Sequence, residues 1–215
     1  MSSKTQMIPI VTGCMPSYTV DSLLDCACGF GKWAGILRTH LNQIANSYIV
    51  GLDIFRDNLE FAKKYGAYDD LILADIRYLP FKKNSFKVVL AAEVIEHIIK
   101  EEGHKFLKDL ETLCFGRVIV TTPNGSWPEN PIMYKNGKVN KYENHVSMWA
   151  VNDFSVNGYR VHSIGLRVNT HSKNFLINQI ISGLDFLLFP GWVIPNLGKH
   201  LVAYKDTIKN KSLLN

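Results

Sequence analysis

The sequence has few cysteines, no apolar run long enough to span a bilayer, and no cluster of basic residues. Four cysteines in 215 residues do not make a disulfide scaffold, and no paired Cys/His pattern supplies a zinc site. The longest apolar stretch, residues 175–189, is interrupted by polar residues and ends at Pro190, so it is too short for a transmembrane helix. The first residues lack the charged start and long apolar core of a signal peptide. These absences favour a cytoplasmic protein with reduced thiols.

The charge balance is mildly basic, with 24 Lys and Arg against 19 Asp and Glu and a net charge of +5. The basic residues are dispersed along the chain, which does not favour nucleic acid as a partner, although it does not exclude it. Apolar residues make up 47% and charged residues 20%, which excludes intrinsic disorder. We expect one domain, residues 1–215, because a chain of this length buries roughly 70% of its unfolded surface.

Short apolar segments rich in β-formers alternate with helix-like segments over the first half of the chain. The expected strands are residues 22–26, 48–52, 71–73, 86–91 and 117–121, and the expected helices are residues 32–44, 58–65 and 93–113. This repetition predicts right-handed βαβ units and an α/β fold, a doubly wound, mostly parallel sheet with helices on both faces. Strands near 159–164 and 199–204 bring the sheet to seven. Residues 166–197 between them are interpreted as an apolar helical insertion before the last strand.

A glycine loop follows the first expected strand. Its sequence is Asp25-Cys26-Ala27-Cys28-Gly29-Phe30-Gly31, and the ligands of open α/β sheets bind where strands end. Gly29 and Gly31 allow a tight turn, and the next helix offers unpaired N–H groups to a polar ligand. Two glycines can also serve only to pack a turn, so the loop alone decides little.

The second expected strand ends at Asp53, 22 residues after Gly31. A carboxylate at this position can accept hydrogen bonds from the ribose hydroxyls of a nucleoside. The alternative is an N-cap for the helix that begins near Arg56. The loop and the acid together also fit a dinucleotide fingerprint, so they do not separate two cofactor classes.

The segments around the third and fourth strands carry a more specific pattern. Ala74-Asp75-Ile76 is followed by Leu79-Pro80-Phe81, by Ser85-Phe86 and then by Glu93-Val94-Ile95-Glu96-His97. With the glycine loop, these motifs resemble the Rossmann-like (class I) S-adenosylmethionine-dependent methyltransferases, in the type 11, ubiquinone-biosynthesis-like branch. The resemblance covers about residues 21–165. It implies a cofactor-binding core over residues 21–122 and substrate-side elements over residues 123–205.

The resemblance also implies roles for individual residues. The loop from Asp25 to Gly31 would wrap the methionine end of S-adenosylmethionine, with Ala27 in the place of the family's usual first glycine. The remaining cofactor contacts would come from the strand ends. Asp53 and Ile54 would contact the ribose, Asp75 the adenine amino group, and the backbone N–H of Ile76 the adenine ring. Glu93 would form part of the pocket wall. Cys28 and Gly29 would contact the cofactor as members of the loop.

Glu93, Glu96 and His97 are spaced i, i+3 and i+4, so on the expected helix they would share one face. With His145 they could hold Mg²⁺ or Mn²⁺. Small-RNA 2′-O-methyltransferases use a similar metal tetrad, and ubiquinone-type enzymes carry a related E-x-x-E-H. Without a metal, Glu96 would favour the helix N-terminus and His97 would pack or act as a general base.

These observations predict methyl transfer to a small-molecule or lipid- or sugar-linked acceptor, at a hydroxyl oxygen. His97 is the expected base, with Glu96 and Glu93 as orienting groups or metal ligands. Metal-dependent RNA 2′-O-methylation, a cofactor-binding accessory subunit and a nucleotide-dependent oxidoreductase are the alternatives. In the apolar segment 175–197, Phe189 and Trp192 extend the apolar surface of a helical stripe, which suits core packing, a substrate wall, a homodimer face or a peripheral membrane contact.

Overall fold

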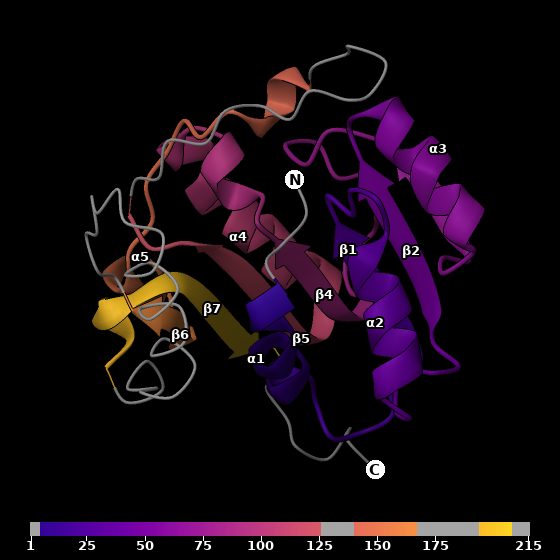
Figure 1. Ribbon diagram of the computed structural model, residues 1–215, viewed down its shortest axis with the longest axis horizontal. Coiled ribbons are helices and arrows are strands. Elements are labelled where there is room, and N and C mark those ends of the chain that lie inside the picture. The colour runs from indigo at the N-terminus through magenta and orange to yellow at the C-terminus, as the bar shows by residue number, and fades with distance from the viewer. Residues whose placement is uncertain (1–4, 126–139, 167–193, 208–215) are drawn as a thin grey trace, which may run out of the picture.

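A single mixed sheet of seven strands forms the centre of the computed structural model (Figure 1). The structure describes residues 5–125, 140–166 and 194–207. The strand order is β3-β2-β1-β4-β5-β7-β6, and only β7 runs antiparallel to its neighbours. The strands are β1 (Ser22–Cys26), β2 (Tyr48–Asp53), β3 (Asp70–Leu73), β4 (Phe86–Ala92), β5 (Cys114–Pro123), β6 (Arg160–Leu166) and β7 (Gly198–Asp206). The predicted fold class, an α/β seven-stranded and mostly parallel sheet, is confirmed.

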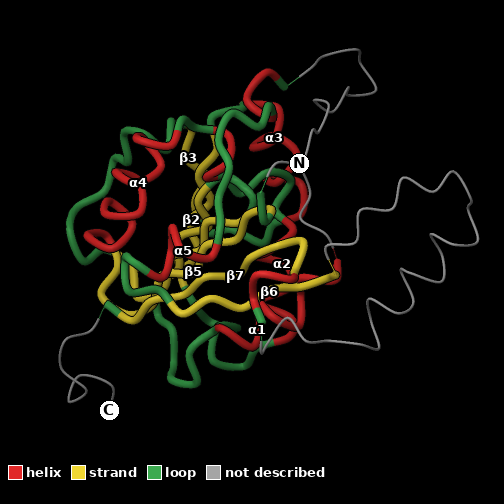
Figure 2. The backbone as a smooth tube through the Cα atoms, turned by 90° about the vertical axis from the view of Figure 1, so that its left-hand side faces the viewer, coloured by secondary structure: helices red, strands yellow, loops and turns green. Residues whose placement is uncertain are grey.

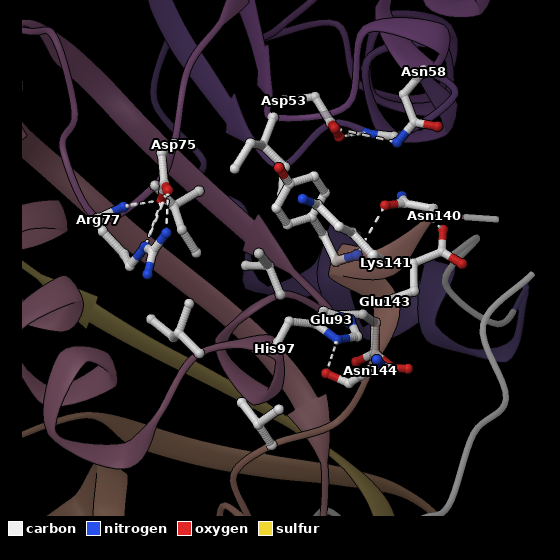
Figure 3. Close-up of a pocket in the computed structure, with 18 of the residues that line it drawn as sticks. Asp53, Asn58, Asp75, Arg77, Glu93, His97, Asn140, Lys141, Glu143 and Asn144 are labelled. Carbon is white, nitrogen blue, oxygen red and sulfur yellow. Dashed lines mark hydrogen bonds and ion pairs between the residues drawn. The ribbon is translucent and has the colours of Figure 1, made fainter. Parts of the chain in front are cut away.

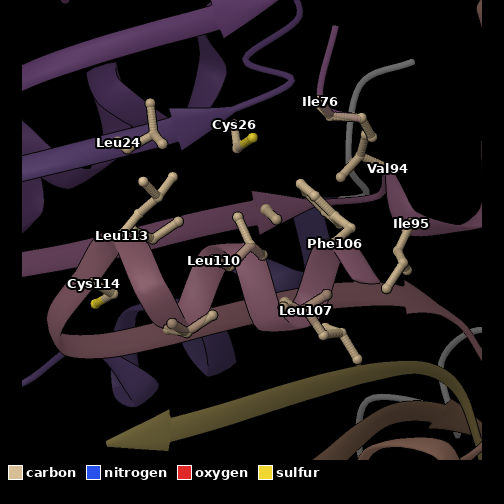
Figure 4. Close-up of a cluster of buried hydrophobic side chains, with 14 of the residues drawn as sticks. Leu24, Cys26, Ile76, Val94, Ile95, Phe106, Leu107, Leu110, Leu113 and Cys114 are labelled. Carbon is tan, nitrogen blue, oxygen red and sulfur yellow. The ribbon is translucent and has the colours of Figure 1, made fainter. Parts of the chain in front are cut away.

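Helices cover both faces of this sheet, which Figure 2 shows nearly edge-on. The α-helices are α1 (Ile8–Cys14), α2 (Lys32–His40), α3 (Arg56–Tyr65), α4 (Lys100–Leu113) and α5 (Val151–Ser155), and 3-10 turns occur at Thr5–Met7, Ile95–His97, Lys141–Glu143 and Pro195–Leu197. Successive residues of β1 point to opposite faces, as a period of two requires. Leu24 packs with α4 in one buried cluster (Figure 4), and Leu23 packs with α1 and α2 in the other.

The expected helix over residues 93–113 is wrong in its first part. The structure has a 3-10 turn at Ile95–His97, and α4 begins only at Lys100. Glu93 has a φ of 54°, in the left-handed region, and its N–H donates to the Thr121 carbonyl of β5. The chain therefore leaves β4 through a turn tied to the sheet. Glu93, Glu96 and His97 do not share a helical face.

Helix α1 was not expected from the sequence. Its buried side chains Ile10, Val11 and Cys14, with Met7 before them, recur at the helical spacing of three and four residues. The predicted apolar helix over residues 175–189, with Phe189 and Trp192 nearby, lies outside the described residues. Among the described helices, none combines the length and apolar character needed to cross a membrane.

Candidate active site

A cavity of about 300 Å³ opens where β1, β2 and β4 end, at the carboxyl edge of the sheet. Figure 3 shows Asp53 and Asn58 on one side of it, Asp75 and Arg77 on another, and His97 with Asn144 below them. Of the predicted site residues, those that line the cavity are Ala27, Gly29, Asp53, Ile54, Asp75, Ile76, Glu93 and His97. Asp25, Cys28, Gly31, Glu96 and His145 are not among the lining residues.

The backbone of the glycine loop is held in an unusual conformation. Ala27, Gly29 and Gly31 have φ values of 61°, 53° and 88°, all in the left-handed region. This region costs a residue with a Cβ roughly 1 kcal/mol or more, which is the physical reason for glycine at the position of Ala27 in the family pattern. At Gly31 a Cβ would also lie 3.0 Å from the Tyr68 ring. The loop therefore tolerates alanine at position 27 at a cost in backbone strain rather than in space.

Asp53 connects the glycine loop to the end of β2. One carboxylate oxygen accepts from the Gly29 N–H at 2.9 Å, and the other accepts from the Phe55 N–H at 2.8 Å and the Asn58 amide at 3.2 Å. Burial raises the pKa of Asp53, and these three donors oppose that rise. A carboxylate has about four lone-pair sites, so little more than one remains for a ribose hydroxyl. Asp53 is therefore a support of the loop as well as a candidate cofactor contact.

Asp25 is not a lining residue of the cavity and contacts a residue that the sequence did not single out. Its buried carboxylate accepts a hydrogen bond of 2.6 Å from the hydroxyl of Tyr68. Burial raises the pKa of Asp25 to about 7, the Tyr68 hydroxyl opposes this, and the charge of Asp53 adds to it. The Tyr68 ring lies under Gly31 and Gly51, so the Asp25–Tyr68 pair supports the loop from below.

Asp75 is held by an arginine two residues later. Its carboxylate accepts from the Arg77 guanidinium at 2.6 and 3.0 Å and from the Arg77 backbone N–H at 2.9 Å. These hydrogen bonds lower the pKa of Asp75, so it is ionised at neutral pH. The adjacent Ile76 lies in the cavity wall. The predicted contacts of Asp75 and Ile76 with adenine stay predictions.

Glu93 and Glu96 belong to two separate groups. The Glu93 carboxylate accepts from the Thr121 hydroxyl at 3.0 Å and lies 3.3 Å from Nδ1 of His200, which comes from β7. The Glu96 carboxylate instead accepts from the Thr122 hydroxyl, also at 3.0 Å. Adjacent residues of β5 point to opposite faces of the sheet. Glu93, bonded to Thr121, and Glu96, bonded to Thr122, therefore lie on opposite sides of β5.

Glu96, His97 and His145 come together as a possible ligand set, with one donor atom from each within 4.8 Å of the others. His145 reaches this place because the Val146 and Ser147 N–H groups donate to the Glu96 carbonyl, at 2.9 and 3.1 Å. Its Nε2 atom is buried and has no hydrogen-bond partner among the described residues. The predicted four-residue metal set is therefore wrong in one member, since Glu93 faces Thr121 and His200.

His97 lies at the cavity wall with a defined orientation. Its Nδ1 atom is 3.1 Å from the Asn144 carbonyl, and its ring is 5.0 Å from that of His145. Burial lowers the pKa of His97 to about 4, against the effect of the Asn144 hydrogen bond. A carbonyl only accepts, so Nδ1 carries the proton of the neutral ring. Nε2 is left with a lone pair for a proton or a metal ion.

The segment that begins at Asn140 also lines the cavity. It contributes a 3-10 turn and its flanks, with Asn140, Lys141, Tyr142, Glu143, Asn144 and Val146 in the wall. The sequence indicated a substrate-side loop here but assigned no role to these residues. His200, Thr121 and Tyr68 were also missed, because the first two meet Glu93 and the third meets Asp25 only through pairing of distant strands and loops.

Comparison with known families identifies the class of this domain. Residues 24–114 match the family described as "Methyltransferase domain". The match covers the strands β1, β2, β3 and β4 with the cavity residues between them, and it agrees with the observed sheet. Residues 24–114 therefore form a methyltransferase domain of the Rossmann-like, S-adenosylmethionine-dependent class, in agreement with the resemblance to the type 11 branch.

An uncharacterised protein of Methanocaldococcus jannaschii is 27% identical over 143 residues, which is 65% of this chain and 55% of that protein. The chain thus spans about half the length of this curated relative. An S-adenosylmethionine-dependent methyltransferase of Mesorhizobium loti aligns with a TM-score of 0.60 at 13% identity, over 94% of this chain and 98% of that one. The magnesium protoporphyrin IX methyltransferase of Synechocystis, solved with bound S-adenosylmethionine, aligns with a TM-score of 0.51 at 16% identity. The alignment covers 93% of this chain and 78% of that one. Structural likeness at these identities shows the fold alone.

Proposed function

We propose that the protein transfers a methyl group from S-adenosylmethionine to a hydroxyl oxygen of a small-molecule or lipid- or sugar-linked acceptor. The observation that carries this proposal is that Gly29, Asp53 and Asp75 line the same cavity as Glu93 and His97. The first three are the cofactor contacts implied by the family resemblance, and the last two carry groups that can orient or deprotonate an acceptor. Residues 1–215 are proposed to act as one domain.

The residues of the cavity suit the cofactor. Left-handed backbone at Ala27 and Gly29 lets a ligand approach the loop closely, and the Asp53 and Asp75 carboxylates offer acceptors for hydroxyl and amino groups. S-Adenosylmethionine supplies an electrophilic methyl group on a sulfonium. The protein then mainly has to align the acceptor and remove its proton.

His97 is the proposed base. Its Nδ1–H is directed at the Asn144 carbonyl, so Nε2 is the atom that would take the hydroxyl proton. With a pKa lowered to about 4, the ring is neutral over the whole neutral range, so its unprotonated form is the one present, with a basicity that burial has reduced. Glu93, which lines the same cavity, would be an orienting group and not the base.

Turnover with a panel of hydroxyl acceptors, followed by the release of S-adenosylhomocysteine, tests this function. His97→Gln should reduce turnover by roughly 10²–10⁴-fold, the usual contribution of a general base, and leave the affinity for S-adenosylmethionine unchanged. His104→Gln is the matched control, because His104 packs beside Trp149 and is not a lining residue of the cavity. A wild-type protein that binds the cofactor but methylates nothing in the panel would favour the accessory-subunit alternative.

The ligand set of Glu96, His97 and His145 supports a second candidate, a metal-dependent transfer to an RNA 2′-hydroxyl. In that case Nε2 of His97 would bind Mg²⁺ or Mn²⁺ and would not act as the base. Excess chelator should then abolish activity and added Mg²⁺ or Mn²⁺ should restore it. His145→Ala should abolish activity, and added Mg²⁺ or Mn²⁺ should not restore it. Full activity in chelator would leave the base role of His97 alone.

A further inference from the structure

We propose that the Glu93 carboxylate is the counter-ion for the cationic methionine end of the cofactor, and that His200 is the positioning residue that holds it there. This inference rests on the proposed use of S-adenosylmethionine. It adds a residue, His200, from a strand more than a hundred positions away from Glu93 in the sequence. It also makes charge, besides shape, part of cofactor recognition.

The sheet register places Glu93 beside the glycine loop. β1 and β4 are adjacent and parallel, with Cys26 opposite Ala91. Two residues further along each strand, the glycine loop and Glu93 leave the sheet together, and both Gly29 and Glu93 line the cavity. At the start of α2, burial lowers the pKa of Lys32 while the charge of Glu93 acts to raise it. The Glu93 charge is therefore felt along the loop that the methionine end would contact.

One backbone contact and two side-chain contacts from β5 and β7 hold Glu93 in place. The Glu93 N–H donates to the Thr121 carbonyl at 3.0 Å, and the Thr121 hydroxyl donates to one carboxylate oxygen, also at 3.0 Å. His200, which is 5% exposed, brings Nδ1 to 3.3 Å from the other oxygen. Its place on the sheet is set by pairing, since His200 lies opposite Pro123 in the β5–β7 register.

The backbone of Glu93 supports a functional explanation of this arrangement. At a φ of 54°, Glu93 occupies the left-handed region, which is sterically unfavourable for a residue with a Cβ. Such strain is typical of sites where the surrounding structure must aim a side chain. The residue held in this conformation is 8% exposed and lines the cavity.

The chemistry of the ligand matches a fixed, largely buried carboxylate. S-Adenosylmethionine carries an α-ammonium group and a sulfonium, whereas S-adenosylhomocysteine has lost the sulfonium charge. The Thr121 hydroxyl occupies one lone-pair site of the Glu93 carboxylate, whereas His200 Nδ1 lies within ion-pair distance of the other oxygen but makes no hydrogen bond to a described residue. About three of the four lone-pair sites are therefore left for a cation. A charge at low exposure interacts with such a cation more strongly than a charge in water does.

Calorimetric titration with S-adenosylmethionine and with S-adenosylhomocysteine tests this proposal without an acceptor. Glu93→Gln should weaken the binding of S-adenosylmethionine by about 10–100-fold, the range for one hydrogen bond to a charged group. His200→Leu should weaken it less, and His200→Asn, which keeps a donor near the Nδ1 position, should recover most of the loss. A loss for S-adenosylmethionine alone assigns the carboxylate to the sulfonium. An equal loss for both ligands assigns it to the ammonium group.

A double-mutant cycle separates positioning from a general structural role. His200→Leu in the Glu93→Gln background should cause no further loss of affinity, because His200 acts through the carboxylate. His162→Asn is the matched control, since His162 stacks on Tyr204 in the same sheet and does not line the cavity. If His200→Leu does not fold, Glu93→Gln and His200→Asn still test the proposal. Wild-type affinities in Glu93→Gln would overturn it, whereas a wild-type protein that binds neither ligand would instead overturn the proposed function.

Discussion

Asp53 shows how one side chain supports both the fold and the ligand site. Its three protein hydrogen bonds join the glycine loop, the start of α3 and the end of β2. The alternative role suggested by the sequence, an N-cap, is not what is seen, because Phe55 holds the N-cap position of α3 without a side-chain cap. Asp53 bonds instead to the loop that the cofactor would contact.

Asp53→Ala should therefore weaken S-adenosylmethionine binding by at least about tenfold. The variant would lose a ribose acceptor worth roughly 1.5–3 kcal/mol as a charged hydrogen bond, and it would release the Gly29 N–H. Calorimetric titration measures the change. Asp21→Ala, at an exposed position before β1, should bind like wild type. Unchanged affinity in Asp53→Ala would remove Asp53 from the cofactor site.

Asp25 should make stability depend on pH. Its pKa is about 7 in the folded protein against an ordinary value of 3.8, so the folded state keeps a proton that the unfolded state loses between these pH values. Stability from this group is complete below about pH 4 and is lost as the pH rises through 7, by up to roughly 4 kcal/mol. Asp25→Asn cannot titrate. Its stability relative to wild type in urea should increase from pH 5 to pH 8.

If the difference in the free energy of unfolding between Asp25→Asn and wild type stays constant from pH 5 to pH 8, the burial argument is contradicted. Tyr68→Phe is the companion variant, since it removes the hydroxyl that opposes the rise in pKa. In this variant, the loss of stability should extend to a higher pH than in wild type.

The roles of the predicted site residues stay predictions, but their positions can be compared with the cavity. The cavity contains eight of the thirteen predicted site residues: Ala27, Gly29, Asp53, Ile54, Asp75, Ile76, Glu93 and His97. The E-x-x-E-H spacing failed as a guide to geometry because it assumed a helix at Glu93. Hydrogen bonds to β5 decide that turn, and neither they nor the approach of His200 can be read from local spacing.

At the scale of the elements, two helical glycines give a direct test of packing against propensity. At Gly103 in α4, a Cβ would lie 2.3 Å from the Trp149 ring, so the bare helix surface is needed for contact with residue 149. At Gly35 in α2, no atom lies within 4 Å of the Cβ position. Alanine favours a helix over glycine by about 0.8–1 kcal/mol at either site.

Gly103→Ala should therefore destabilise the protein by roughly 1–3 kcal/mol, as overpacking does, despite the gain in helix propensity. Gly35→Ala should stabilise it by up to about 1 kcal/mol. Urea unfolding at one pH measures both values. Equal stabilisation by the two substitutions would mean that α4 does not pack on Trp149 as described.

The fold class and most strand positions follow from the sequence because buried parallel strands appear as short apolar runs. Helix α1 could have been predicted from the helical spacing of Met7, Ile10, Val11 and Cys14. The start of α4 could not, because Val94, Ile95 and Ile98 are buried by the turn and continue the apolar pattern of the helix.

For the whole molecule, the central claim is that the cavity takes S-adenosylmethionine and not a dinucleotide. A glycine loop followed by an acid fits both cofactors. In the sequence, the Asp75 and E-x-x-E-H motifs are what favour S-adenosylmethionine over a dinucleotide. The family match over residues 24–114 supports the first cofactor. The acceptor and its accepting atom depend further on the substrate-side elements, which extend beyond this match.

The most direct test is the melting temperature with S-adenosylmethionine or NAD added separately. A ligand at 100 times its Kd stabilises the native state by about 2.7 kcal/mol, which raises the Tm of a chain of this size by about 5–10 °C. We predict that S-adenosylmethionine produces this rise in wild type, that Asp53→Ala reduces it, and that NAD leaves the Tm unchanged. A rise with NAD and none with S-adenosylmethionine would contradict the account.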